Sequence, residues 1–317
     1  MATTFPAGEG ITAVDTVMCG RERVTSSYLL EGPEPAIVET GPTTSLRALT
    51  EGLRSQGIGR GDLVHVVVTH IHLDHAGGAG AVAEVFPRAT VWVHERGAPH
   101  LADPRKLVAS ASRIYGEERL RDMFGPVQPV PAGRLRAVAD GDTISLGDRT
   151  LEVMYTPGHA GHHVCLMDSR SGGVFVGDAF GVFLPDVRVL RPATPPPEFD
   201  LELAIGSIER IAGRDPSVLL FSHFGPAPDV RMLSELAVTR LREWTGIVEG
   251  ALRSTGRVEE VVAALERGTE PELDRTSSGG GGRERYELLS SYEMNALGIM
   301  RYLRKLAGED PRSPEPG

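Results

Sequence analysis

Four candidate metal ligands stand within six residues of the chain, directly after an apolar segment. Thr69 follows Val66-Val67-Val68 and leads into His70, His72, Asp74 and His75. Alternation along a strand places His70 and His72 on one side of its end, and the following turn brings the other two to the same space. Three imidazoles and a carboxylate exceed what one tetrahedral ion binds when it keeps an open position. The spacing therefore predicts two metal ions about 3.5–4 Å apart.

Further candidate ligands follow later apolar segments, each with glycine nearby. They are His159, Asp178 and His223. Side chains from several strand ends commonly converge on one site of a sheet protein, and glycine permits close approach of the backbone. We therefore expect all seven candidates to contribute to a single centre.

This set of residue types indicates metal-dependent hydrolysis. Two cations lower the pKa of a shared water to near neutrality, and an open coordination position polarises a substrate carbonyl. Asp74 or Asp178 is expected to carry the proton to the leaving group. Gly77-Gly78 lacks the Lys-Ser/Thr of a phosphate-binding loop, and the chain shows no serine or cysteine nucleophile pattern. The sequence thus favours a hydroxide over a side-chain nucleophile.

The order His-x-His-x-Asp-His, Gly-His, Gly-Asp and Ser-His resembles that of the metallo-β-lactamase-fold hydrolases, over residues 1 to about 225. The resemblance implies an α/β (α+β) fold, a four-layer αββα sandwich with two divalent metal ions at one edge. Zinc is favoured, and iron or manganese also fits the donor set. One ion would be held by His70, His72 and His159, and the other by Asp74, His75 and His223, with Asp178 and a hydroxide bridging them.

The resemblance also implies residues that support the ligands without binding metal. The family more often has Asp at the position of Glu39, near the metals. A histidine three positions after the ligand His159, here His162, is common in the family and does not bind metal. We expect Glu39 and His162 to orient the ligands from behind.

Short β-branched segments separated by glycine and proline fill the first two thirds of the chain, with helical patterns between them, which is typical of a layered fold. We predict a catalytic domain over 1–228, with an inserted lid-like segment at 101–131, a C-terminal helical region over 229–308, and a disordered tail over 309–317. The last helix has an apolar stripe that packs on the sandwich or pairs in a homodimer. The stripe consists of Leu289, Tyr292, Ala296, Ile299, Leu303 and Leu306.

The net charge of −10 disfavours nucleic acid or an anionic membrane as a partner, because both attract basic surfaces. The N-terminus lacks a signal-peptide pattern, and no run approaches 18 apolar residues. Two cysteines are too few for a disulfide scaffold. We therefore expect a cytoplasmic protein that acts on a small molecule and has neither a nucleic-acid nor a membrane partner.

The motifs are less specific for substrate than for fold. In the family, true β-lactamases usually lack the bridging aspartate, and homoserine lactonases often have Tyr where this chain has Gly181. The resemblance is greatest to the glyoxalase II branch and implies a hydrolase of a thioester, ester or lactone. A phosphodiesterase or nuclease-type member and a non-catalytic metal-binding sensor are the alternatives. The candidate substrate-pocket residues are Tyr115, Phe124, Phe180, Tyr292 and Asn295.

Overall fold

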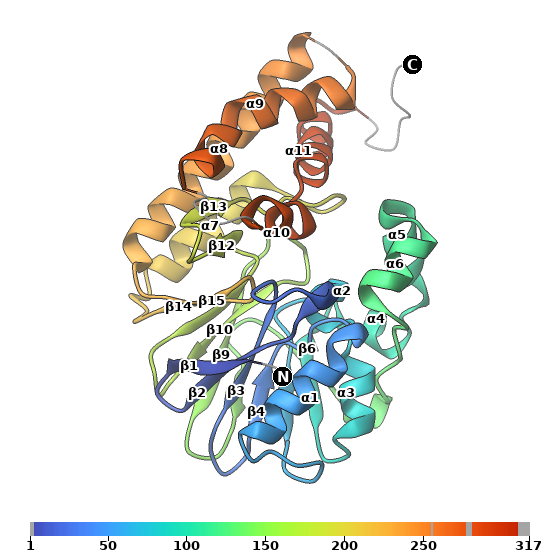
Figure 1. Ribbon diagram of the computed structural model, residues 1–317, viewed down its shortest axis with the longest axis vertical. Coiled ribbons are helices and arrows are strands. Elements are labelled where there is room, and N and C mark those ends of the chain that lie inside the picture. Colours follow the sequence, from blue (N-terminus) through green and yellow to red (C-terminus); the bar gives the residue numbers. More distant parts are fainter. Residues whose placement is uncertain (1–2, 255, 277–280, 310–317) are drawn as a thin grey trace. The chain divides into compact units, whose positions relative to one another are not determined.

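The computed structural model describes residues 3–254, 256–276 and 281–309 (Figure 1). The predicted disordered tail lies outside these residues from position 310 onward. None of the described helices is both long enough and apolar enough to cross a membrane.

The chain forms two compact units, each built from segments that are discontinuous in sequence. The first unit comprises Met1–Tyr155, His162–Gly177 and Pro216–Pro228, and the second comprises Thr156–Gly161, Asp178–Asp215 and Asp229–Gly317. The predicted domains 1–228 and 229–308 instead follow the order of the chain, and their boundaries stay a prediction.

Two mixed sheets form the first unit in the described part of the chain. The seven-stranded sheet has the order β1 (Thr4–Gly8), β2 (Ile11–Asp15), β3 (Ser26–Leu30), β4 (Ala36–Val38), β5 (His65–Val67), β6 (Thr90–His94) and β7 (Leu135–Val138). The six-stranded sheet has the order β15 (Gly225–Ala227), β14 (Leu219–Phe221), β11 (Val174–Gly177), β10 (Val164–Asp168), β9 (Thr150–Tyr155) and β8 (Thr143–Ser145).

Helices connect the strands of the first sheet. They are η1 (Met18–Gly20), η2 (Thr43–Ser45), α1 (Leu46–Ser55), α2 (Leu73–Ala76), α3 (Ala79–Val85), α4 (Ala98–Ala102), α5 (Arg105–Tyr115), α6 (Glu117–Phe124) and η3 (Ala132–Arg134). Strands β4, β5, β6 and β7 run parallel, so their carboxyl ends meet at one edge of the sheet. Ligands bind at this edge in open α/β sheets.

Alternation of side chains along the strands produces two apolar layers. Ile37 and Val66 pack with Leu53 of α1 and Val82 of α3. Their neighbours Val38 and Val67 point the other way and pack with residues of the second sheet. A strand that is buried on both faces has to be apolar throughout, which explains the continuous runs in the sequence. The predicted layered fold, with two mixed sheets flanked by helices, is confirmed.

The segment 101–131 is helical as far as Phe124 and then continues to η3 without regular structure. Two hydroxyl groups next to α1 hold the end of α6 and the residues that follow it. Thr44 Oγ1 donates to the carbonyl oxygen of Met123 at 2.7 Å, and Thr43 Oγ1 donates to that of Pro126 at 2.8 Å. The segment is thus fixed to the carboxyl edge of the first sheet. Its role as a lid stays a prediction.

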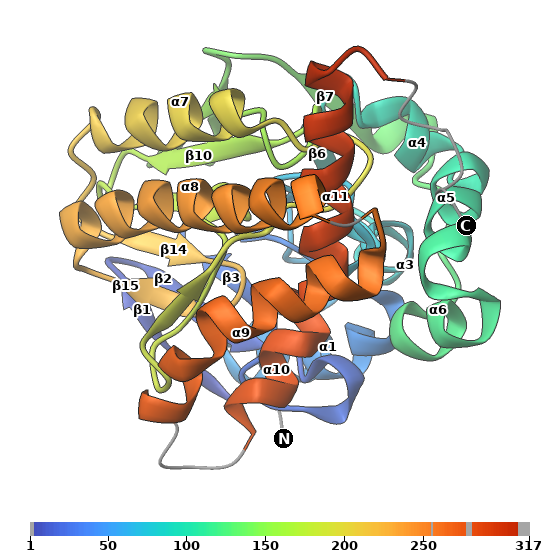
Figure 2. The ribbon, with the colours of Figure 1, turned by 90° about the horizontal axis from the view of Figure 1, so that it is seen from above.

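The second unit contains the hairpin of β12 (Val182–Leu184) and β13 (Val189–Arg191), together with the helices α7 (Leu201–Ala212), α8 (Val230–Ser254), α9 (Val258–Thr276), α10 (Gly282–Leu289) and α11 (Tyr292–Leu306). Helix α11 contacts α8 and α9 (Figure 2). The predicted apolar stripe does not lie on one helix, because Leu289 ends α10 and the other stripe residues belong to α11. Most of it is covered inside this unit, whereas Leu306 at its end is 66% exposed.

Tyr292 and Asn295, two predicted pocket residues, are buried in the second unit. The guanidinium carbon of Arg191 lies 4.1 Å from the centroid of the Tyr292 ring, and Trp244 stacks on Tyr292 at 5.6 Å. The side-chain oxygen of Asn295 accepts hydrogen bonds from the N–H and the hydroxyl of Thr194, at 2.9 and 2.7 Å. Tyr292 thus joins α11 to β13, and Asn295 joins α11 to the segment that follows β13. The contact of both side chains with substrate stays a prediction.

A buried ion pair in the six-stranded sheet also makes a hydrogen bond to the other sheet of the first unit. Arg149 donates from Nε and Nη2 to the two carboxylate oxygens of Asp168, at 2.8 and 2.6 Å, and from Nη1 to the carbonyl oxygen of Gly10 at 2.8 Å. The side chains are 1% and 0% exposed. Burial is the largest effect on the pKa of Asp168 and raises it, but hydrogen bonds from Arg149 and Ser171 outweigh burial and lower the pKa overall.

Replacing Asp168 with Asn should lower the free energy of unfolding by about 3–5 kcal/mol, because it leaves a buried guanidinium without its counter-charge. Denaturant unfolding at neutral pH measures this loss. The matched control is Asp148→Asn, whose carboxylate is 46% exposed and pairs with Arg170. This control should lose less than about 1 kcal/mol.

The effect of pH on Asp168→Asn has a defined sign. Because the pKa of Asp168 in the folded protein lies below its ordinary value of 3.8, the ion pair stabilises the protein fully above that pH. Its contribution is lost as the pH falls further. The difference between wild type and variant should therefore shrink below pH 3.8, and a difference that grows there would contradict this assignment.

Candidate metal centre

Strand ends and one short helix supply the candidate ligands of the first unit. Thr69 and His70 lie just beyond β5, and His223 follows β14 in the other sheet. His72 precedes α2, a single turn that carries Asp74 and His75. Because α2 is short and begins at the strand end, its side chains stay close to those of the strand.

Asp74, His75 and His223 converge on one point. The Nε2 atoms of the two histidines are 3.1 Å apart, and Asp74 Oδ2 lies 3.6 Å from His75 Nε2 and 3.3 Å from His223 Nε2. Ligand atoms that surround a zinc ion tetrahedrally at about 2.0–2.1 Å are separated by about 3.3–3.4 Å. The three atoms therefore have the spacing of a metal-ligand set.

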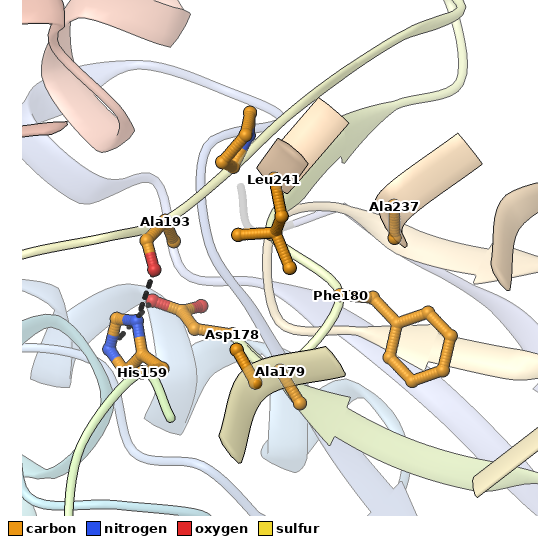
Figure 3. A pocket seen from close by; sticks show the side chains of 10 residues that line it. His159, Asp178, Ala179, Phe180, Ala193, Ala237 and Leu241 are labelled. Carbon is orange, nitrogen blue, oxygen red and sulfur yellow. Dashed lines mark hydrogen bonds and ion pairs between the residues drawn. The ribbon is translucent and has the colours of Figure 1, made fainter. Parts of the chain in front are cut away.

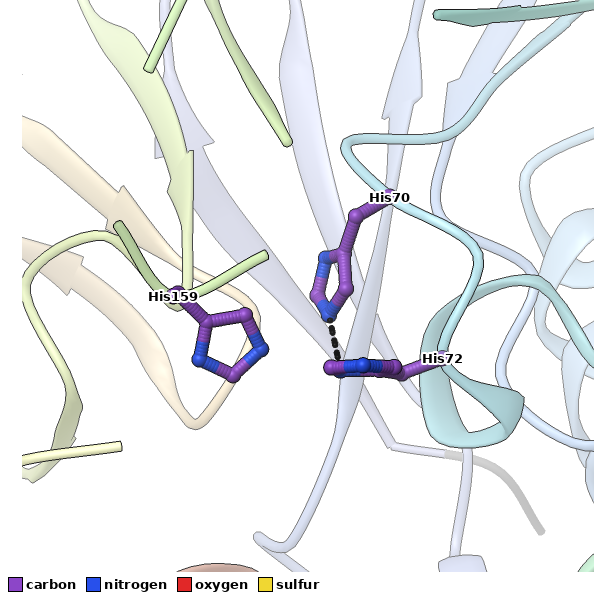
Figure 4. Close-up of side chains that lie close together, drawn as sticks. All are labelled: His70, His72 and His159. Atoms are coloured by element: carbon purple, nitrogen blue, oxygen red, sulfur yellow. Dashed lines mark hydrogen bonds between the residues drawn. The ribbon is translucent and has the colours of Figure 1, made fainter. Parts of the chain in front are cut away.

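His70 and His72 form a second close pair. His70 Nε2 lies 3.0 Å from His72 Nδ1, with the rings nearly perpendicular (Figure 4). The His70 ring also lies 4.0 Å from the His75 ring, measured between centroids. The two groups of ligand atoms are thus adjacent, as a centre with two neighbouring ions requires.

The remaining nitrogen of each buried imidazole contacts a hydrogen-bond partner. His75 Nδ1 lies 3.1 Å from Glu39 Oε1, and His223 Nδ1 lies 3.1 Å from the carbonyl oxygen of Val24. Since both partners accept hydrogen bonds, Nδ1 carries the proton and Nε2 keeps its lone pair. This is the tautomer that a metal ligand needs.

His70 reaches the same carboxylate through a hydroxyl group. Its Nδ1 is 3.0 Å from Thr69 Oγ1, and this hydroxyl donates to Glu39 Oε1. The threonine oxygen therefore accepts from His70 Nδ1–H. Ser222 Oγ also donates to Glu39 Oε1, at 3.0 Å, so the hydroxyl residues that precede His70 and His223 both bind this glutamate.

Glu39 lies behind the ligands, where the resemblance implies a supporting residue. Its side chain is completely buried, and its backbone has a φ of +69° just after β4. A φ in the left-handed region turns the chain sharply. The longer carboxylate thus supports His75 directly and His70 through Thr69.

His162 packs against the rings of the ligands. It is stacked on His70 at 6.1 Å and perpendicular to His72 at 5.5 Å. The ring of His163, which the sequence pattern did not indicate as a site residue, lies 5.0 Å from that of His70. A Cβ at Gly177 would lie within 2.6 Å of both His163 Nε2 and Thr69 Oγ1, so this position requires glycine. Thr69 and Ser222 each directly precede a candidate histidine ligand. This position in the sequence was the signal that could have identified them as supporting residues.

The second unit brings His159 and Asp178 together (Figure 3). His159 Nε2 lies 3.4 Å from Asp178 Oδ2, while His159 Nδ1 lies 2.9 Å from the carbonyl oxygen of Ala193. The carbonyl accepts from Nδ1–H, so Nε2 faces the carboxylate with its lone pair. Gly158, with a φ of +132°, permits this position because a Cβ there would overlap the backbone of Ala204.

A small pocket adjoins these two side chains in the second unit. Its walls are mostly small or apolar, and the lining residues are His159, Asp178, Ala179, Phe180, Gly181, Pro192, Ala193, Ala204, Ala237 and Leu241. Gly181 has a φ of +81°, and a Cβ there would overlap the carbonyl oxygen of Arg191. A tyrosine three residues after Asp178 is therefore incompatible with this backbone.

The other predicted pocket residues lie in separate places. Phe180 is buried in the wall of the pocket beside Asp178. In the first unit, Tyr115 and Phe124 contact each other edge to face at 5.3 Å, with Phe124 buried and Tyr115 half-buried. Substrate contact by these residues stays a prediction, as does the joining of all seven ligands in one centre.

Comparison with known proteins identifies the family. Residues 20–223 match the model of the Metallo-beta-lactamase superfamily. Acyl-coenzyme A thioesterase MBLAC2 of Homo sapiens is 30% identical over 193 residues, which are 54% of this chain and 63% of that protein. Hydroxyacylglutathione hydrolase of a Synechococcus strain is 28% identical over 184 residues, 58% and 57% of the two chains. The chain thus spans less than two thirds of the length of these relatives.

The fold is also found among solved structures. A crystal structure of the metallo-beta-lactamase family protein TTHA1429 from Thermus thermophilus matches with a TM-score of 0.64 at 23% identity, covering 89% of each chain. The fold implied by the sequence resemblance is confirmed. The family match extends from η1 to His223 and so includes every candidate ligand. The chain therefore belongs to the metallo-beta-lactamase superfamily and carries a candidate histidine and aspartate metal site.

Proposed function

We propose that this protein is a dinuclear metal hydrolase that cleaves a small thioester, with esters and lactones as related substrates. The observation that carries the proposal is the convergence of Asp74, His75 and His223 at the spacing of metal ligands, beside the pair His70 and His72. Thioesters are favoured because the names of two relatives specify hydrolysis of acyl-coenzyme A and of hydroxyacylglutathione. Zinc is the proposed metal, and the cytoplasm is the proposed compartment because two cysteines are too few for a disulfide scaffold.

In this proposal His70, His72 and His159 hold one ion, Asp74, His75 and His223 hold the other, and Asp178 bridges them. Chain connectivity supports the participation of the second unit's residues. His159 lies in a six-residue segment, Thr156–Gly161, whose two ends continue into the first unit, and Asp178 directly follows Gly177 of that unit. Two divalent cations, when bound, lower the pKa of water to near neutrality and polarise a carbonyl group.

The chain's own residues orient the ligands and handle the proton. The Nδ1 partners of His70, His75 and His223 keep each Nε2 unprotonated. The Asp74 side chain is 22% exposed, so its carboxylate is accessible to solvent and can accept a proton. A thiol leaving group, with an ordinary pKa of about 8.5, needs less proton assistance than an alcohol. This difference agrees with a thioester substrate.

The fully loaded protein should bind two zinc ions per chain, because its seven candidate ligands exceed the needs of one ion. Elemental analysis after remetallation and gel filtration measures this ratio. His223→Ala should retain about one ion, because it removes a ligand from one group only. A plateau at one equivalent in the wild type would reject the dinuclear proposal.

Asp178→Asn should reduce kcat at least about 100-fold on a thioester panel, because a neutral amide bridges two cations poorly. The matched control is Asp186→Asn in the same unit, whose carboxylate pairs with Arg285 at 2.6 Å. This control should retain near-normal kcat. Near-normal turnover by Asp178→Asn with a full metal complement would show that Asp178 does not bridge.

Glu39→Gln should weaken zinc binding about 10- to 100-fold, since the support of His75 loses its charge. Competition with a chromophoric chelator measures the affinity independently of turnover. Glu34→Gln is the control, because Glu34 makes a similar contact of 3.1 Å with His65 Nε2 but at the amino end of β5. Equal zinc affinity in the two variants would disprove a supporting role for Glu39.

A further inference from the structure

Residues 23–26, which lead into β3 and are called here the supporting segment, supply the hydrogen-bond acceptors behind the His223 ring. His223 Nδ1 lies 3.1 Å from the carbonyl oxygen of Val24 and 3.3 Å from the hydroxyl oxygen of Thr25. The Thr25 hydroxyl donates its own proton to Met18 Sδ at 3.4 Å, so its oxygen is free to accept from Nδ1–H. Both acceptors of this proton are buried, and both come from the same segment.

Further contacts join the supporting segment to the residues on either side of His223. Ser26 N–H donates to the carbonyl oxygen of Ser222 at 2.8 Å. The guanidinium carbon of Arg23 lies 5.7 Å from the centroid of the Phe224 ring. The segment therefore lies against the whole strand end that carries this ligand, and its position determines where the two acceptors meet the imidazole.

The carboxylate of Asp15, at the end of β2, closes the loop that leads into the supporting segment. Its Oδ1 accepts from Val17 N–H at 3.0 Å, and its Oδ2 accepts from Arg23 N–H at 2.7 Å. Asp15 is only 1% exposed. The next residue, Thr16, donates from N–H and Oγ1 to the carbonyl oxygen of Thr25, at 3.0 and 2.8 Å. The end of β2 thus holds the supporting segment at two points.

The loop that Asp15 closes has a backbone that requires such contacts. Val17, Cys19 and Arg23 have φ values of +49°, +54° and +61°, in the left-handed region that residues other than glycine rarely adopt. Conformations of this kind persist only where the surrounding structure fixes them. Asp15 binds the N–H groups of two of these three residues. Without its carboxylate, we expect the loop to relax and the supporting segment to shift.

We propose that Asp15 is a positioning residue, which holds the two acceptors of His223 in place and so fixes the tautomer and the orientation of this candidate ligand. The inference rests on the proposed function in one respect, because it takes His223 as a ligand of one of two ions. Groups that orient a ligand histidine from behind affect metal affinity strongly. The effect of Asp15 should therefore fall on the ion held by Asp74, His75 and His223, and not on the other ion.

Asp15→Ala removes both hydrogen bonds and should weaken binding of one zinc ion about 10- to 100-fold, while the affinity for the other stays within about twofold. Competition with a chromophoric chelator measures both affinities independently of turnover. Asp15→Asn should lose less, because its amide oxygen still accepts from one N–H group. This variant also keeps the proposal testable if Asp15→Ala does not fold. Zinc affinities equal to those of the wild type in both variants would overturn the proposal.

Nuclear magnetic resonance of the zinc-loaded, full-length protein measures the positioning itself. The Nδ1–H proton of His223 is identified by its absence from the spectrum of His223→Ala, and its hydrogen bond should place it downfield. Asp15→Ala should move this resonance upfield or broaden it through exchange with water. The Nδ1–H of His75, which faces Glu39, is the internal control and should keep its position. An unchanged His223 resonance would contradict a positioning role.

Two control variants separate positioning from general effects. Asp142→Ala also removes a carboxylate that closes a turn, because Asp142 Oδ2 accepts from Ala139 N–H at 2.8 Å before β8. It should keep both zinc affinities. Asp168→Asn is expected to destabilise the first unit, but Asp168 lies at the far end of β10 from His163, about 13–17 Å along the strand. If Asp168→Asn loses one zinc ion as Asp15→Ala does, the loss reflects stability and the proposal is wrong.

The outcomes also distinguish this inference from the proposed function. If Asp15→Ala weakens one zinc ion but the wild type hydrolyses no thioester, the inference stands and the thioester proposal fails. If the wild type hydrolyses thioesters while Asp15→Ala changes neither zinc affinity nor the His223 resonance, the inference fails and the proposed function stands. If the wild type binds a single ion, the dinuclear proposal fails, and the His223 resonance decides the inference. If both hold, excess zinc should restore much of the kcat that Asp15→Ala loses when zinc is limiting.

Discussion

Buried imidazoles can serve as metal ligands only if each one keeps a lone pair directed toward the shared centre, and this constraint organises the first unit. Glu39 satisfies this constraint for two of the candidate ligands. Its carboxylate contacts His75 Nδ1 directly and His70 through the Thr69 hydroxyl, and it accepts a hydrogen bond from Ser222. A buried carboxylate is stable only when several donors surround it. The same contacts that stabilise Glu39 therefore fix the tautomers of the ligands.

The topology of the sheets brings these partners together. Glu39 follows β4 and Thr69 follows β5, and because the two strands are parallel neighbours, their carboxyl ends lie side by side. Ser222 and His223 come from the other sheet, at the end of β14. Glycine is required where these segments crowd, as at Gly177, where any side chain would meet His163 and Thr69. The packing of the two sheets thus also determines how these ligands and their supporting residues are arranged.

A small pocket adjoins His159 and Asp178 in the second unit. Its walls are mostly small or apolar. Substrate choice in a shared fold depends on such peripheral residues more than on the catalytic core.

The sequence by itself determined the family, the layered fold and the candidate ligands. The ligand types are dictated by the chemistry of metal binding, and the apolar strands before them form a local pattern. Tertiary structure alone decided which groups support the ligands. Nothing local indicates that Thr69, Ser222 and His75 share the carboxylate of Glu39, because these contacts join residues up to 183 positions apart. The burial of Tyr292 and Asn295 likewise depends on contacts with the distant residues Arg191, Trp244 and Thr194. Residue types and spacing carry chemical information, whereas contacts between distant segments arise only when the chain is folded.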